Sequence, residues 1–186
     1  MTEEEKLKAL LIVDLQNDFC PGGALAAPEG DKVVPVINRL LEKFRVVVAS
    51  KDWHPPHSIH FNIWPLHCIQ ESAGAEFHPA LNSENIQQVF LKGTRDLDDG
   101  YSAFEATNLN LDDYLKSKGV TDLYVTGLAT DYCVKASAID AAKRGFKVFV
   151  VTDAVSAVNA KPDDGRESLQ LMKAEGVTLV DSSQVR

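Results

Sequence analysis

Short, almost continuous apolar runs alternate along the chain with segments in which apolar residues recur at helical spacing. The runs predict buried strands at residues 9–13, 45–50, 86–91, 122–126, 147–152 and 177–180. The segments between them predict helices at residues 31–44, 109–118, 131–144 and about 164–175. Strands that alternate with helices are typical of a parallel sheet covered on both faces. The pattern therefore predicts an α/β fold, with three αβα layers around a mostly parallel, Rossmann-like sheet of six strands.

Helix boundary signals refine this picture. Asp31 is a good N-cap residue for the first helix, and Pro35 falls in its first turn, where a missing N–H does little harm. One long segment, residues 52–85, shows little periodicity and contains all five histidines. A segment of that length without regular elements inside a compact domain is usually functional or disordered, and its aromatic residues argue against disorder.

Composition narrows the class of protein. The 186 residues and 45% hydrophobic content suit a single domain over residues 1–186. A net charge of −8 argues against a nucleic-acid partner, and we see neither a signal peptide nor an apolar run long enough to span a membrane. Three cysteines, an odd number, favour a reducing, cytoplasmic compartment. The expected partner is a small molecule, and the sequence leaves homo-oligomerisation open.

Three chemically capable side chains follow different predicted strands. Asp14 and Lys92 close two of the apolar runs, and Cys133 starts the helix after a third. The carboxyl ends of parallel strands share one edge of a sheet, so these side chains can converge there. A helix N-terminus favours a thiolate at Cys133. Taken singly, each residue has an ordinary alternative: a buried thiol, a solvated strand end or a turn residue.

The histidine-rich segment offers a set of metal ligands. It reads Asp52-Trp53-His54 at a strand end, followed by His57, His60 and His67. Side chains two apart on a strand point the same way, so Asp52 and His54 can share one ion. One carboxylate with several imidazoles suits Zn²⁺, Fe²⁺ or Mn²⁺. The alternative is that these histidines are only surface or hydrogen-bonded residues.

Together these segments resemble the nicotinamidases of the isochorismatase-like hydrolase superfamily. The matching segments occur in family order over roughly residues 8–160; they are Val13-Asp14-Leu15-Gln16-Asn17-Asp18-Phe19, Lys51-Asp52-Trp53-His54-Pro55, Trp64-Pro65-Leu66-His67-Cys68, Lys92-Gly93, Tyr101-Ser102-Ala103-Phe104 and Gly127-Leu128-Ala129-Thr130-Asp131-Tyr132-Cys133-Val134. The resemblance implies an amidase that hydrolyses nicotinamide to nicotinate and ammonia in NAD salvage. Pyrazinamide is a second expected substrate.

The resemblance also implies roles for individual residues. Asp14, Lys92 and Cys133 match the family's catalytic triad, with Cys133 forming a thioester. The oxyanion hole corresponds to backbone N–H groups at Ala129, Thr130 and Cys133, aimed by a cis peptide expected at Ala129–Thr130. We predict that this activated thiol is alkylated faster than Cys20 and Cys68.

The family's metal ligands carry over to Asp52, His54 and His67, holding one divalent ion, with zinc favoured over iron or manganese. His60 is an optional fourth ligand, because some members have a histidine at that spacing; others have one at the position of Ser58. His57 is expected to lie near the metal site without binding the ion, either exposed or in contact with one of the ligands.

Substrate-binding residues follow from the same resemblance. They are Phe19, Trp64, Tyr101 and Leu128; the alternative for the three aromatic residues is that they simply belong to the core. Tyr132 replaces the histidine of mycobacterial-type members, and we expect it to point away from the site. The acidic loop 95–100 is expected to shape the entrance.

Three other functions compete with this interpretation. One is an isochorismatase-like hydrolase that acts on an enol ether or another amide, such as a carbamoyl compound. Another is an oxygenase-like or metal-water enzyme that uses Asp52 and two histidines, with Cys133 merely structural. The last is a catalytically silent binding module of the same fold. Intact Asp14, Lys92 and Cys133 argue against that last alternative.

Overall fold

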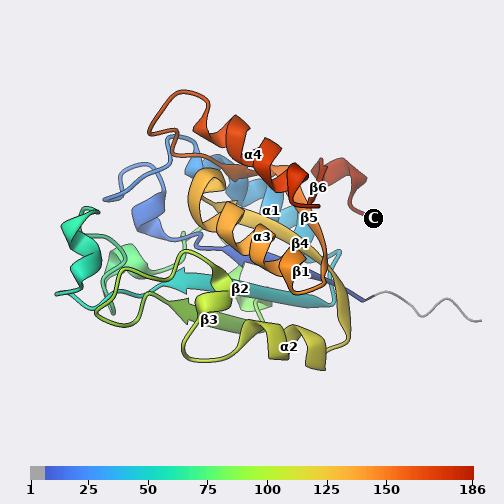
Figure 1. Ribbon diagram of the computed structural model, residues 1–186, viewed down its shortest axis with the longest axis horizontal. Coiled ribbons are helices and arrows are strands. Elements are labelled where there is room, and N and C mark those ends of the chain that lie inside the picture. The colour runs from blue at the N-terminus through green and yellow to red at the C-terminus, as the bar shows by residue number, and fades with distance from the viewer. Residues whose placement is uncertain (1–6) are drawn as a thin grey trace, which may run out of the picture.

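Six parallel strands form one sheet in the computed structural model, which describes residues 7–186. The strands are β1 Leu7–Val13, β2 Val46–Asp52, β3 Gln88–Lys92, β4 Val120–Leu128, β5 Lys147–Ser156 and β6 Thr178–Val180. Their order across the sheet is β3-β2-β1-β4-β5-β6, and every neighbouring pair is parallel. The predicted α/β class is confirmed. Because every pair is parallel, the carboxyl ends of the strands lie at one edge of the sheet, and those of β2 and β3 point to the left in Figure 1.

Helices cover both faces of this sheet. Alternate residues of β1 divide between two cores: Leu10 and Ile12 pack with helix α1 (Val34–Leu41), whereas Leu11 and Val13 pack on the opposite face. That face is covered by α2 (Leu111–Ser117), α3 (Lys135–Lys143) and α4 (Asp164–Ala174). Because alternate side chains of a strand point to opposite faces, β1 contributes to both apolar layers, and its residues Ala9–Val13 are fully buried.

Three helices begin later than the sequence predicts: α2 begins at Leu111 in place of residue 109, and the other two are displaced further. The first starts as a 3₁₀ turn at Gly30–Val33, so Asp31 lies in that turn and is not the N-cap of α1. Pro35 still lies in the first turn of α1, as predicted. The segment after β4 begins as a π-helical turn, Thr130–Val134, and becomes α-helical only at Lys135. Such wide turns are frequent at functional sites.

The histidine-rich segment has short 3₁₀ turns in place of long elements, as its sequence predicts. The turns lie at Ile59–Asn62, Ala73–Ala75 and Ser83–Asn85. Backbone hydrogen bonds tie the segment together, including those that His54 exchanges with Cys68 and Gln70. It lies beside the carboxyl ends of β2 and β3, at the left of Figure 1.

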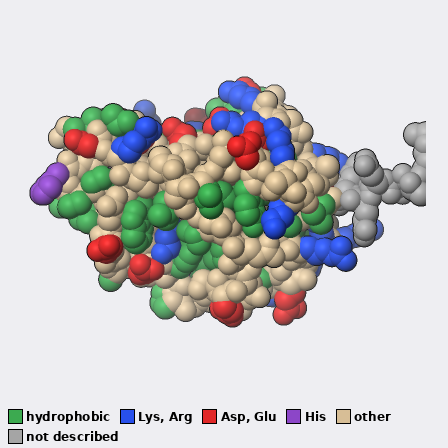
Figure 2. Space-filling view, turned by 90° about the horizontal axis from the view of Figure 1, so that it is seen from below, with side chains coloured by type: hydrophobic (Ala, Val, Ile, Leu, Met, Phe, Trp, Pro, Cys, Tyr) green, Lys and Arg blue, Asp and Glu red, His purple; other side chains and the backbone are tan. Residues whose placement is uncertain are grey.

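The distribution of charge on the surface is relevant to the kind of partner that the protein could bind. On the face shown in Figure 2, acidic and basic side chains are interspersed around hydrophobic ones, in place of one continuous basic patch. Within residues 7–186, no helix has the length and apolar character that crossing a membrane requires.

Candidate active site

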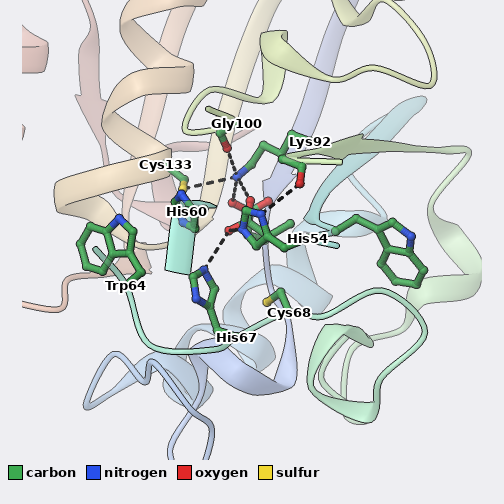
Figure 3. Close-up of polar contacts among 12 residues, drawn as sticks. His54, His60, Trp64, His67, Cys68, Lys92, Gly100 and Cys133 are labelled. Atoms are coloured by element: carbon green, nitrogen blue, oxygen red, sulfur yellow. Dashed lines mark hydrogen bonds and ion pairs between the residues drawn. The ribbon is translucent and has the colours of Figure 1, made fainter. Parts of the chain in front are cut away.

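Three strand ends bring Asp14, Lys92 and Cys133 into contact. Asp14 follows β1, Lys92 is the last residue of β3, and Cys133 lies in the π-helical turn after β4. Nζ of Lys92 is 2.8 Å from Oδ2 of Asp14 and 3.5 Å from Sγ of Cys133 (Figure 3). Lys92 reaches both by crossing the end of β2, which lies between β3 and β1. The predicted convergence of these three side chains is therefore observed.

Asp14 is held in place by the neighbouring strand. Its φ of 45° turns the chain sharply at the end of β1. Its N–H donates to the carbonyl of Ser50 at 3.2 Å, and the Ser50 hydroxyl donates to Oδ1 at 2.7 Å. Oδ1 is therefore engaged by Ser50, while Oδ2 faces Lys92.

Lys92 is fully buried but has several polar partners. Its ammonium donates to Asp52 Oδ1 and to the carbonyl of Gly100, and it pairs with Asp14. Burial alone would lower the pKa of Lys92, but the two carboxylates outweigh burial and raise the pKa well above its ordinary value. Lys92 is therefore a permanent cation in the centre of the site.

Burial also changes the pKa values of Asp14 and Cys133, the two side chains that could exchange a proton. It raises the pKa of Asp14 to about 6, against the opposing effect of Lys92. It also raises the pKa of Cys133 well above its ordinary value, with Lys92 opposing and the two carboxylates adding to the rise. The expectation of a favoured thiolate at rest is therefore wrong, because burial and the two carboxylates outweigh the ammonium of Lys92. Cys133 rests as a thiol beside a carboxylate that can take its proton.

Close packing shapes the turn that carries Cys133. Gly127 has a φ of +103°, and a Cβ there would meet the carbonyl oxygen of Val13 at 2.0 Å, so only glycine fits. The chain contains a cis peptide, but at Leu128–Ala129 and not at the expected Ala129–Thr130. The bond lies at the point where β4 stops pairing with β5 and the chain leaves the sheet.

Four buried side chains next to these three residues form a candidate ligand set. Nε2 of His54 and of His67 lie 3.5 and 3.8 Å from Asp52 Oδ2. His60 stacks on His54 with ring centroids 4.4 Å apart, and one nitrogen from each of the three histidines lies within 4.8 Å of the others (Figure 3). Lys92 and the histidines outweigh burial and hold the pKa of Asp52 well below its ordinary value. The structure thus brings the optional ligand His60 together with Asp52, His54 and His67.

The three imidazoles are oriented alike. Nδ1 of His54 lies 3.0 Å from the carbonyl of Gly93, and Nδ1 of His67 lies 2.7 Å from that of Pro65. Nδ1 of His60 lies 2.8 Å from Asp98 Oδ1. An acceptor at Nδ1 places the proton there and leaves Nε2 free to bind a metal. Nε2 of His54 is buried without a hydrogen-bond partner, so the donor set fits a divalent ion.

Residues outside the ligand set hold it in place. Buried Gln16 accepts from the N–H of Asp52 and donates to its carbonyl, both at 2.8 Å. Ser58 caps the turn that carries His60 by accepting from the His60 N–H at 3.2 Å. His57 is exposed, which agrees with its expected place outside the cluster.

One pocket is lined both by Cys133 and by the candidate metal ligands. Its lining includes Cys133, Asp52 and the three histidines, with Phe19, Trp64 and Tyr101 among the walls. The indole N–H of Trp64 donates to the Tyr101 hydroxyl at 2.9 Å, which fixes two of these walls relative to each other. The expectation that these aromatic residues face a pocket agrees with the structure. Asp99 and Gly100 also line it, so the acidic loop does shape the site.

Two expectations about the walls are wrong. Leu128 does not line the pocket; it is fully buried in the core shared with α1, because it still belongs to β4. Tyr132 does line the pocket, with its ring 5.2 Å from that of Trp64 in an edge-on arrangement. The π-helical turn brings it to the same side as Cys133. Of the oxyanion candidates, Ala129 and Cys133 border the pocket, whereas Thr130 lines a separate cavity.

Sequence reasoning missed several functional candidates. Asp98 contacts His60, Leu25 and Val158 line the pocket, and buried Asp131 holds the Val158 loop by accepting from its N–H at 3.0 Å. A single carboxylate in an acidic loop gives no sequence signal of its partner. Asp131 lies within the cysteine motif, but its contact is with the Val158 loop, 27 residues further along the chain.

Comparison with known proteins identifies the class. Residues 8–184 match the isochorismatase domain model, and the chain belongs to that family. Within it, the chain is 44% identical to the nicotinamidase of Escherichia coli, with 92% of this chain and 93% of the relative covered.

Two solved structures show the same relationship. A pyrazinamidase of Pyrococcus horikoshii in complex with zinc is 42% identical, with a TM-score of 0.85 over 94% of this chain and 98% of that one. The L. infantum protein PnC1 in complex with nicotinate is 37% identical, with a TM-score of 0.89 over 96% and 94%.

Proposed function

We propose that this chain is a metal-dependent cysteine amidase that hydrolyses nicotinamide to nicotinate and ammonia. The observation that carries the proposal is that Cys133, beside Asp14, and the imidazole cluster line one aromatic-walled pocket. A flat heteroaromatic ring that carries a carboxamide could place its ring nitrogen at the imidazole cluster and its carboxamide at Cys133. The relatives named nicotinamidase and the nicotinate complex support the same substrate.

In the first half-reaction, Asp14 accepts the thiol proton of Cys133 while Sγ attacks the carboxamide carbon. The resulting tetrahedral intermediate collapses, the C–N bond breaks, and Asp14 returns the proton to the leaving nitrogen, which departs as ammonia. Lys92 stays charged throughout, so it orients Asp14 and stabilises the sulfur anion as it forms. The product of this step is a thioester on Cys133.

In the second half-reaction, water attacks the thioester carbon and Asp14 accepts one of its protons. The C–S bond breaks, the sulfur of Cys133 regains a proton from Asp14, and nicotinate leaves after losing its acid proton. Each half-reaction passes through an oxyanion. We assign its stabilisation to backbone N–H groups at Ala129, Thr130 and Cys133, in the turn that starts where β4 ends.

We assign Asp52, His54, His60 and His67 as ligands of one divalent ion, with zinc favoured because of the nitrogen-rich donor set and the zinc-bound relative. When bound, the ion would hold the pyridine nitrogen and so orient the carboxamide toward Cys133. Phe19, Trp64 and Tyr101 would enclose the ring. Pyrazinamide has the same ring geometry and is the expected second substrate.

The reaction and the sequence also suggest the domain organisation, the metabolic role and the compartment of the protein. We propose that residues 1–186 form a single domain and that the product feeds NAD salvage. Three buried free cysteines suit a reducing compartment, so we place the reaction in the cytoplasm.

The deciding experiment measures ammonia release from nicotinamide by the purified protein, beside Cys133→Ala and a chelator-treated sample. We expect activity in the parent and its loss in both other samples, with recovery on adding zinc. Turnover retained by Cys133→Ala with metal bound would favour a metal-water mechanism. No ammonia from a folded, zinc-loaded parent would overturn the proposal and direct the search to other amides.

A further inference from the structure

We propose that Asp98 is a positioning residue that fixes His60 as a metal ligand and connects it to the aromatic wall of the pocket. This inference rests on the proposed assignment of His60 as a ligand. It concerns a side chain from the acidic loop after β3, outside both the triad and the ligand set.

The contact between the two side chains is specific. Oδ1 of Asp98 lies 2.8 Å from Nδ1 of His60, and the His60 side chain is only 4% exposed. His54 and His67 meet backbone carbonyls at the same ring position, so His60 is the histidine of the cluster whose orientation depends on a side chain. A carboxylate behind an imidazole fixes its tautomer and makes its other nitrogen a stronger donor to a metal.

The same carboxylate oxygen has a second partner. The Tyr101 hydroxyl donates to Asp98 Oδ1 at 3.3 Å and accepts from the indole N–H of Trp64 at 2.9 Å. Trp64 also stacks near His60, with ring centroids 6.3 Å apart. Asp98 therefore joins one ligand of the metal site to two walls of the ring-binding pocket, so metal binding and pocket shape depend on one side chain.

The loop itself is anchored close to this contact. Asp96 Oδ1 accepts from the N–H of Ile59 at 2.7 Å, one residue before His60. Asp99 Oδ2 pairs with Arg95 at 2.7 Å. Since Asp96 supports the loop without touching the histidine ring, Asp96→Asn keeps an acceptor, removes a negative charge and provides a matched control.

The test measures zinc affinity of reloaded apoprotein by competition with a chromophoric chelator. We expect Asp98→Ala to weaken zinc binding about 10- to 100-fold, Asp98→Asn to retain part of the affinity because it keeps an acceptor, and Asp96→Asn to match the parent. The absorption spectrum of the Co²⁺-loaded protein should change in Asp98→Ala toward that of His60→Ala. A merely structural role for Asp98 would leave that spectrum unchanged.

The decisive arm is the double variant. If Asp98 acts through His60, Asp98→Ala adds no further loss of zinc affinity in a His60→Ala background. Equal losses in both backgrounds, or parent-like zinc binding by Asp98→Ala, would overturn the inference. Parent-like zinc binding by His60→Ala would instead show that His60 is not a ligand. The design thus separates a failure of the ligand assignment from a failure of the role inferred for Asp98. Ammonia release from nicotinamide is scored separately.

Discussion

The ammonium of Lys92 lies 2.8 Å from Oδ2 of Asp14, and both side chains are completely buried. The same ammonium also contacts Asp52, so one cation neutralises two carboxylates that face away from solvent. Burial of three charged groups is tolerated only because they are paired. The pair is therefore as important for the folded state as for chemistry.

In the metal-free protein, replacing Lys92 with Met should lower the free energy of unfolding by about 3 to 5 kcal/mol, because it leaves Asp14 and Asp52 buried without their cation. Urea denaturation followed by circular dichroism measures this loss. The control is Lys116→Met, which breaks an exposed pair with Asp112 and should cost about 1 kcal/mol or less. Similar losses in the two variants would contradict the structural argument.

Activity should fall in acid because Asp14 must be ionised to accept the proton of Cys133. Its pKa is raised to about 6, so the carboxylate is present above that pH and is protonated below it. We expect kcat/KM for nicotinamide to decline toward about tenfold per pH unit below pH 6. Circular dichroism at each pH separates this decline from unfolding. A flat profile down to about pH 4.5, where an ordinary carboxylate starts to titrate, would show that Asp14 is not the base.

Cys133 should still be alkylated before Cys20 and Cys68. All three thiols have a raised pKa, so reaction with iodoacetamide near neutral pH should be slow. All three thiols are buried in the core, but Cys133 differs because it also lines the pocket and touches Lys92, whereas Cys20 and Cys68 do not line that pocket. Peptide mass mapping over time measures the order. Equal labelling of the three residues would contradict this prediction.

Replacing Gly93 with Ala should weaken metal binding. A Cβ at residue 93 would lie 2.4 Å from Cε1 and 2.6 Å from Nδ1 of His54, so the imidazole must move. Gly119→Ala is the control, since its φ is also positive but nothing lies within 4 Å of the added Cβ. Both variants pay a backbone cost of about 1 kcal/mol. Only Gly93→Ala should lose zinc affinity in chelator competition, and equal affinities would show that His54 tolerates the displacement.

The sequence predicts the sheet and the strand-end residues well because both depend on local patterns. Fully apolar runs such as residues 9–13 have few alternatives to a buried parallel strand, and Asp14, Lys92 and Cys133 follow from where the strands end. The raised pKa of Cys133 could not be predicted, because it results from burial by distant segments. The contact of Asp98 with His60 joins residues 38 apart, and the inward position of Tyr132 depends on a π-helical turn.

Asp52 occupies the border between the two halves of the site, with Oδ1 toward Lys92 and Oδ2 toward His54 and His67. Because the two oxygens share one carboxylate, a change in the charge next to one oxygen of Asp52 alters the charge on the other. Substitutions in the ligand set and in the triad should therefore be epistatic, with double variants departing from the sum of single effects.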